Sequence, residues 1–127
     1  MNDSRHEFKR FYAMSAEMQD PALSLGEPNA KQLVWDYLKI NMSSWNSVCP
    51  HQKDISKKCN LAVATVSRTL QELEKKGFIE KDGKDGITNR YFLNPHFIWK
   101  GEAKDHRLAI AKWDKIQQRK QEDRNEF

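Results

Sequence analysis

The sequence has few residues of the kinds that define disulfide frameworks and membrane spans. Its two cysteines, Cys49 and Cys59, form no CxxC pair, and the first residues contain no apolar run typical of a signal peptide. Reduced thiols, buried or half-buried in a cytoplasmic protein, are therefore expected. No stretch approaches the roughly 20 apolar residues that cross a bilayer, so we expect no membrane partner.

The signatures of catalysis and of metal binding are also missing. The four histidines contain no His-x-His pair that would hold the metal of a strand-nicking enzyme, and no GxxxxGK[ST] loop for ATP is present. A zinc site needs about four ligands at paired spacings, which Cys49, His51 and Cys59 do not supply. We therefore expect no enzyme activity, no metal and no cofactor.

The charges that are present favour a polyanionic partner. The 127 residues suit one domain with a modest core, and their net charge is +4. Residues 53–90 hold nine Lys and Arg against six Asp and Glu, whereas residues 1–27 hold three against five. The basic excess thus lies in the middle of the chain, although mixed charge at this density is also typical of an ordinary solvated surface.

The chain before this basic region predicts an arm and a helix. Residues 1–27 are expected to form a partly irregular arm, whose aromatic side chains cover the domain (Phe8, Phe11 and Tyr12). From about Pro28 to Met42, apolar residues recur with helical spacing, and Asn29 can cap the first turn. This helix begins a predicted domain of residues 28–101.

A helix-turn-helix is predicted by the stretch DISKKCNLAVATVSRTLQELEKKG, residues 54–77. Its first helix covers about residues 51–58 and ends at Asn60, a residue suited to the left-handed conformation. Its second helix covers about residues 62–76 and buries a stripe of Val66, Leu70 and Leu73. So tight a turn makes the two helices cross steeply, which lets the second enter the major groove of DNA.

The opposite side of this second helix carries residue types suited to reading DNA. Arg68 can bind guanine O6 and N7 together, and Gln71 can pair with adenine N6 and N7. Val63 and Ala64, at the start of the helix, are small and let the helix approach the floor of the groove closely. Ser67 adds a hydroxyl, and Thr65 suits a phosphate contact. The alternative is that this side is only the solvated face of a core helix. The DNA-binding residues predicted here are Val63, Ala64, Thr65, Ser67, Arg68 and Gln71.

A β-hairpin, or wing, is predicted after Gly77. Residues 78–81 read as a strand, residues 82–86 as a turn with two glycines, and residues 87–93 as the return strand, with Val48 as a short edge strand beside it. Its tip or outer edge would present further DNA-binding residues to phosphates or the minor groove. Two acidic residues at the tip, Asp82 and Asp85, oppose such contacts. The predicted wing contacts are Lys81, Lys84, Asn89 and Arg90.

A last helix is predicted from about Glu102 to Arg119, followed by a frayed, charged tail from Lys120 within the segment 102–127. Its apolar side is broad for a terminal helix and needs cover. It either packs on its own domain or pairs two copies of the chain into a homodimer. The residues that would form that homodimer surface are Leu108, Ala109, Trp113 and Ile116.

These elements predict an α+β, mainly α, winged helix-turn-helix with a C-terminal helix. The segment 54–83 resembles the reading unit of MarR-type and Crp-type regulators, through TVSR at 65–68 and LEKKGFI at 73–79. A closer resemblance follows the wing. YFLNPHFIWKG at 91–101, then Arg107 and residues 109–113, is similar to the C-terminal part of RepL-type plasmid replication and maintenance proteins. The opening at residues 8–12 also resembles theirs, and the likeness covers roughly residues 8–115.

The resemblance implies a plasmid- or phage-borne protein that binds double-stranded DNA near an origin or its own promoter. We therefore expect a sequence-specific DNA-binding protein acting in plasmid replication or maintenance. A transcriptional repressor of its own or a plasmid operon would use the same mechanism and is the main alternative. A strand-nicking enzyme is disfavoured by the histidine pattern, and a winged helix that binds only protein stays open.

Overall fold

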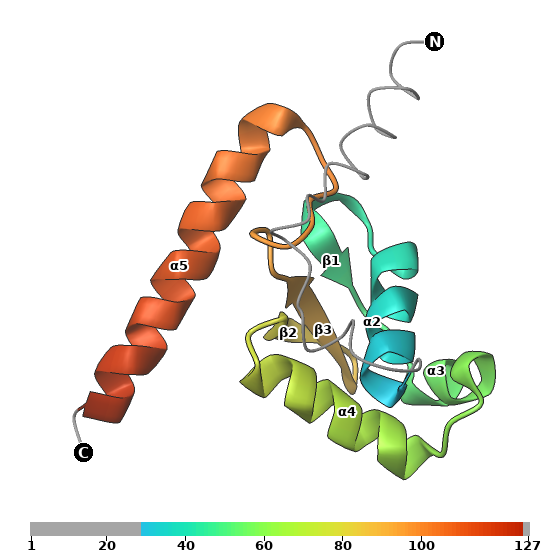
Figure 1. The fold of residues 1–127 in the computed structure, drawn as a ribbon. Helices are drawn as coiled ribbons and strands as arrows, with labels where there is room; N and C mark the ends of the chain where they lie inside the picture. The colour runs from blue at the N-terminus through green and yellow to red at the C-terminus, as the bar shows by residue number, and fades with distance from the viewer. Residues whose placement is uncertain (1–28, 126–127) are drawn as a thin grey trace, which may run out of the picture.

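The computed structural model describes residues 29–125, so the predicted arm of residues 1–27 and its aromatic contacts lie outside the described residues. The described chain forms four helices, one short 3-10 turn and a three-stranded antiparallel sheet (Figure 1). In chain order the elements are α2 (Ala30–Asn41), η3 (Ser44–Asn46), β1 (Ser47–Val48), α3 (Gln52–Cys59), α4 (Val63–Lys75), β2 (Ile79–Asp85), β3 (Thr88–Leu93) and α5 (Ala103–Asn125).

Three helices, α2, α3 and α4, pack together on one side of the sheet. The predicted cap is confirmed, because Asn29 Oδ1 accepts a hydrogen bond from the Gln32 amide at 3.0 Å. Each helix turns its apolar stripe inward, and each fully buried aliphatic side chain adds about 1.5–3 kcal/mol relative to exposure. The stripe predicted for α4 is buried as expected, together with apolar residues of the other two helices, in one core: Val34, Trp35, Leu38, Ile55, Val66, Leu70 and Leu73.

The central strand β3 is buried on both faces of the sheet. The strand order is β1-β3-β2, so β3 pairs with Val48 of the predicted edge strand on one side and with β2 on the other. Successive side chains of a strand point to opposite faces. Tyr91 and Leu93 accordingly join the helical core, whereas Phe92 belongs to a second apolar cluster. The predicted α+β, mainly α, winged-helix fold is confirmed.

Helix α5 covers the opposite face of the sheet from α2, α3 and α4 (Figure 1). Its Trp113 meets Phe92 edge-on, with ring centroids 5.7 Å apart. Further along, the buried carboxylate of Glu80 on β2 accepts hydrogen bonds from Gln117 Nε2 at 2.7 Å and Lys120 Nζ at 2.6 Å. The helix continues to Asn125, so the prediction of a frayed tail from Lys120 is wrong for residues 120–125, while residues 126–127 lie outside the described residues.

The wing turns later in the chain than predicted. Residues 82–85 belong to β2, and the loop is the two-residue pair Gly86–Ile87, with φ of +65° at Gly86 as in a type II′ turn. Between the pairs of Lys81 and Lys84 with β3, the register shifts by a bulge, where Gly83 has φ of +85°. The second glycine of the motif thus makes the turn, and the first bends the strand.

A buried asparagine joins the chain before the wing to the chain after it. Asn46 is fully buried (0% exposed), with Nδ2 donating to the carbonyl oxygens of Leu93 and Ile98, both at 2.9 Å. Its Oδ1 accepts from the part-buried Lys100 amide at 2.9 Å, so one side chain satisfies three backbone groups. These bonds hold the link that leads from β3 into α5.

Replacement of Asn46 by Ala should destabilise the fold by about 3 kcal/mol or more, because three backbone groups lose their partner. Asn46 also has a left-handed backbone, with φ of 54°, which Ala disfavours. Urea denaturation measures the loss. Asn41→Ala is the matched control, since its amide reaches Tyr37 O at the surface and its removal should change stability by less than about 1 kcal/mol. Equal losses in the two variants would contradict this role for Asn46.

Candidate nucleic-acid interface

The turn between α3 and α4 is tight and internally hydrogen-bonded. Asn60 adopts the predicted left-handed conformation, with φ 55° and ψ 50°. The Leu61 amide donates to Ser56 O at 3.0 Å, and the Ser56 hydroxyl donates back to Leu61 O. With α3 ending at Cys59 and α4 beginning at Val63, the connection is three residues long, which fixes the crossing of the two helices.

The outward side of α4 lies at the molecular surface. Val63 is 45% exposed, and Ala64, Arg68 and Gln71 are exposed as well. Ser67 is half-buried at the margin of this side. These five residues therefore share one uncovered helix face among the described residues, as predicted, and we call this set of five the outward face of α4.

Thr65 lies on the flank of α4 rather than on the outward face. Its side chain is half-buried, and its Oγ1 accepts from Arg68 Nη2 at 3.4 Å. The same residue's carbonyl accepts from Thr69 Oγ1 at 2.7 Å. The bond from Arg68 is long and lies at the surface, so it orients the guanidinium weakly and leaves its other donors available.

The predicted wing residues are spread along the hairpin. Lys81 pairs across the sheet with Tyr91, and its Nζ lies 4.0 Å from Glu74 Oε1 of α4. Lys84 is exposed and pairs in register with Asn89. Arg90 is half-buried. The structure therefore brings Lys84 and Asn89 together near the tip and leaves Lys81 at the base.

Asn89 has a partner inside the hairpin. Its side chain forms a hydrogen bond with that of Tyr91. Burial raises the pKa of the Tyr91 hydroxyl, the hydrogen bond with Asn89 lowers it by less, and the negative charge of Glu74 raises it. The amide is thus held by the sheet. The residue at the tip itself is Ile87, which is 97% exposed. Sequence reasoning missed it, because its β-branched side chain was assigned to the return strand.

Acidic residues around this surface are largely paired within the chain. On α4, Glu72 Oε2 lies 3.3 Å from Lys31 Nζ, in addition to the contact between Glu74 and Lys81. Asp82, predicted to oppose phosphates at the wing tip, instead pairs with Lys112 of α5 at 3.2 Å. These exposed pairs add little stability. Their effect on the surface is to offset the negative charges near the outward face of α4.

The surface predicted for a homodimer is mostly occupied by the chain itself. Ala109 (0% exposed) and Trp113 (4%) are buried against Phe92 and Trp99, and Ile116 packs beside them. Only Leu108 remains well exposed, at 60%. The apolar side of α5 is therefore covered by the sheet of the same chain, which is the intramolecular alternative.

The two thiols and the carboxylates give no metal site in the part of the chain that the structure describes. Cys49 and Cys59 are free and half-buried, as predicted. Burial, with a smaller contribution from Asp36, raises the pKa of the Cys59 thiol, which disfavours the thiolate that a metal needs. Among residues 29–125 no group of three His, Cys, Asp or Glu side chains could hold an ion, and no helix could span a membrane.

A tight helix-turn-helix, a hairpin beside it and an edge strand completing the sheet define a winged helix-turn-helix protein. Comparison with known families makes the assignment narrower. A family described as Firmicute plasmid replication protein (RepL) matches residues 24–127. The chain belongs to this family of plasmid replication proteins, which confirms the predicted resemblance. No curated protein and no solved structure matches the chain significantly.

Replacement of Trp113 by Ala should destabilise the protein by about 3–5 kcal/mol, because a large buried side chain leaves a cavity between α5 and β3. The molecular mass, measured by light scattering under native conditions, should stay that of the wild type. Leu108→Ala, at the exposed position of the same helix, is the control and should change stability by less than about 0.5 kcal/mol. A lower mass for the Trp113 variant would show that this face joins two copies.

Proposed function

We propose that this plasmid replication protein binds double-stranded DNA sequence-specifically, with the outward face of α4 in the major groove and no chemistry of its own. It would act where plasmid DNA is, in the cytoplasm. The observation that carries the proposal is the exposure of Ala64, Arg68 and Gln71 on a helix held by a three-residue turn. An isolated helix with these residues would be unremarkable, but this one is presented beside a wing.

The residue types on this face fit base recognition. Val63 and Ala64 stand at the first turn of α4, where short side chains allow the backbone to approach the floor of the groove. Arg68 offers two parallel donors to a guanine, and Gln71 offers one donor and one acceptor to an adenine. Ser67 can contact either type of base edge or a phosphate.

The wing would add contacts to the DNA backbone. Lys84 is exposed near its tip, and Arg90 lies on the same strand as Asn89. The pairing of Asp82 with Lys112 removes one of the two negative charges that would oppose a phosphate. Contacts of this kind carry little sequence information and make binding salt-dependent.

Footprinting of the full-length protein on its host plasmid tests the proposal. Discrete protected sites at the origin of replication would support the replication role. Protection confined to promoters would assign the protein to the alternative, repression of its own or a plasmid operon. An absence of any footprint at low salt, with a folded protein, would refute DNA binding and favour a winged helix that binds protein.

Replacement of Arg68 by Ala should weaken binding to a cognate site by about 1–3 kcal/mol and relax base preference at one position, because a bidentate base contact is lost. Titration on the cognate duplex and on a random duplex measures both effects. Arg107→Ala on α5 is the matched control, since it removes an exposed arginine away from α4. An equal loss on both duplexes would mean that Arg68 does not read bases.

Replacement of Lys84 by Gln should weaken binding to all duplexes alike and lower the slope of log K against log salt by about 0.9, the value for one lost phosphate contact. Lys104→Gln is the control and should keep the slope, because it removes an exposed lysine in the first turn of α5 that is paired with Glu102. A slope that Lys84→Gln leaves unchanged would place the wing outside the interface.

A further inference from the structure

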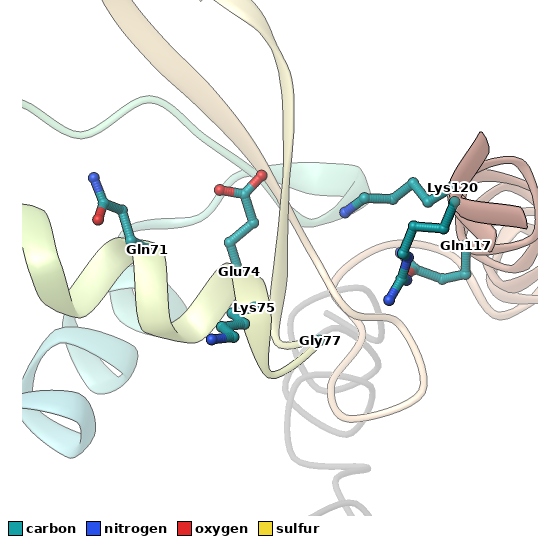
Figure 2. Close-up of a pocket in the computed structure, with 7 residues that line it drawn as sticks. Gln71, Glu74, Lys75, Gly77, Gln117 and Lys120 are labelled. Atoms are coloured by element: carbon teal, nitrogen blue, oxygen red, sulfur yellow. The ribbon is translucent and has the colours of Figure 1, made fainter. Parts of the chain in front are cut away.

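An open groove separates the C-terminal half of α4 from the C-terminal half of α5. Figure 2 shows Gln117 and Lys120 extending from α5 toward the end of α4. The groove has a volume of about 350 Å³ and no apolar side chain in its lining. The lining residues are Gln71, Glu74, Lys75 and Gly77 from the α4 side, and Gln117, Lys120 and Arg124 from α5.

Two of the charges in this groove are paired and two are not. Glu74 lies beside Lys81, and Lys120 is bound to the buried Glu80. Lys75 and Arg124 are both exposed, and neither forms an ion pair or a side-chain hydrogen bond with any residue from 29 to 125. Counting only partners within residues 29–125, the groove therefore presents two unpaired cations, together with the side-chain amides of Gln71 and Gln117.

The fold places Arg124 in the groove through the same helix face that holds α5 to the sheet. Trp113, Lys120 and Arg124 are separated by seven and four residues, so they share one side of the helix. Trp113 packs on Phe92 and Lys120 binds Glu80. One turn later the same side faces the end of α4. Without the Glu80 anchor, the last turn of α5 would have no fixed relation to α4.

The groove is continuous with the outward face of α4 through Gln71, which belongs to both. Seven residues separate Arg68 from Lys75, about 10 Å along a helix. The major groove is about 12 Å wide, so a helix that inserts Arg68 among the bases brings the Lys75 end to the phosphates that border the groove. Arg124 faces the same point from α5.

We propose that Lys75 and Arg124 bind backbone phosphates of the duplex, just outside the bases read by α4, and that α5 thereby serves as a second, sequence-independent arm of the DNA interface. This rests on the proposed function. The ligand class is the phosphodiester of double-stranded DNA. A free phosphate group, as in inorganic phosphate or a nucleotide, shares this chemistry and is separated from DNA by the test.

The test compares the full-length protein with the double variant Lys75→Gln/Arg124→Gln on two duplexes that contain the same site. One duplex extends about one helical turn beyond the site on the side of the α4 C-terminus, and the other stops at the site. On the long duplex the slope of log K against log salt should be smaller for the variant than for the wild type by about 1.8, the value for two phosphate contacts. On the short duplex it should match the wild type.

The double variant Arg107→Gln/Lys115→Gln is the matched control. It removes the same charge from exposed positions of α5, with Lys115 two residues from Trp113 and so on the opposite side of the helix. It should keep the wild-type slope on both duplexes. If this control loses as much slope as the groove variant, the effect is one of net charge and the proposal is overturned.

Two further outcomes also overturn the proposal. If the wild type binds the long duplex and the groove variant binds it with the same affinity and slope, the groove is outside the interface, while the proposed DNA binding stands. If inorganic phosphate or ATP binds the wild type saturably, the groove variant abolishes that binding, and duplex length has no effect, the groove takes a free phosphate group. Failure of the wild type to bind any duplex would refute the proposed function itself.

Discussion

The structure depends on burying both faces of one strand. In β3, Tyr91 and Leu93 enter the core formed with α2, α3 and α4, and Phe92 between them packs against Trp113 of α5. A hairpin by itself is marginally stable in water, so neither a wing nor a terminal helix of this size would be well ordered alone. The shared strand makes them one unit with the helix-turn-helix. The orientation of the wing relative to α4 is thus set by the core and not by the hairpin.

Polar contacts of Asn46 and Glu80 then fix the two ends of α5 relative to the sheet. Asn46 ties the link after β3 to the segment before β1, so the chain enters α5 from a fixed point. Glu80 binds the far part of α5 through Gln117 and Lys120. A buried carboxylate that lost such partners would be strongly destabilising. The two contacts lie at opposite ends of α5, on either side of the apolar contacts of Ala109 and Trp113, and together with them they hold the helix against the sheet.

The sequence predicted the elements whose side chains follow a regular period. The spacing of Val66, Leu70 and Leu73 predicted the inward side of α4, and Asn60 predicted the end of α3, because helix periodicity and left-handed caps are local properties. The outward residues of α4 followed from the same periodicity. Their exposure agrees with that prediction, whereas their contact with DNA stays a prediction.

Features that depend on distant residues were not predictable in this way. Asn46 lies 47 and 52 residues from the carbonyls that it binds, and no periodicity marks a buried polar residue. The C-terminal part of α5 is bound by Glu80, 40 residues before Lys120. In the wing, two glycines three residues apart suit one long turn as well as a bulge followed by a tight turn. The cross-strand pairing in the structure selects the bulge followed by the tight turn.

The attachment of the wing to α5 has a consequence for the thermodynamics of association. A free hairpin would lose conformational entropy when it settled against a duplex, and that loss would oppose binding. Here β3 is immobilised during folding, and Asp82 and Glu80 of β2 both contact α5. The hairpin therefore loses this conformational entropy when the protein folds, and not when a partner binds. The tip at Gly86 and Ile87 lies beyond these contacts, and Ile87 is 97% exposed, so conformational adjustment to a partner would fall to this two-residue loop.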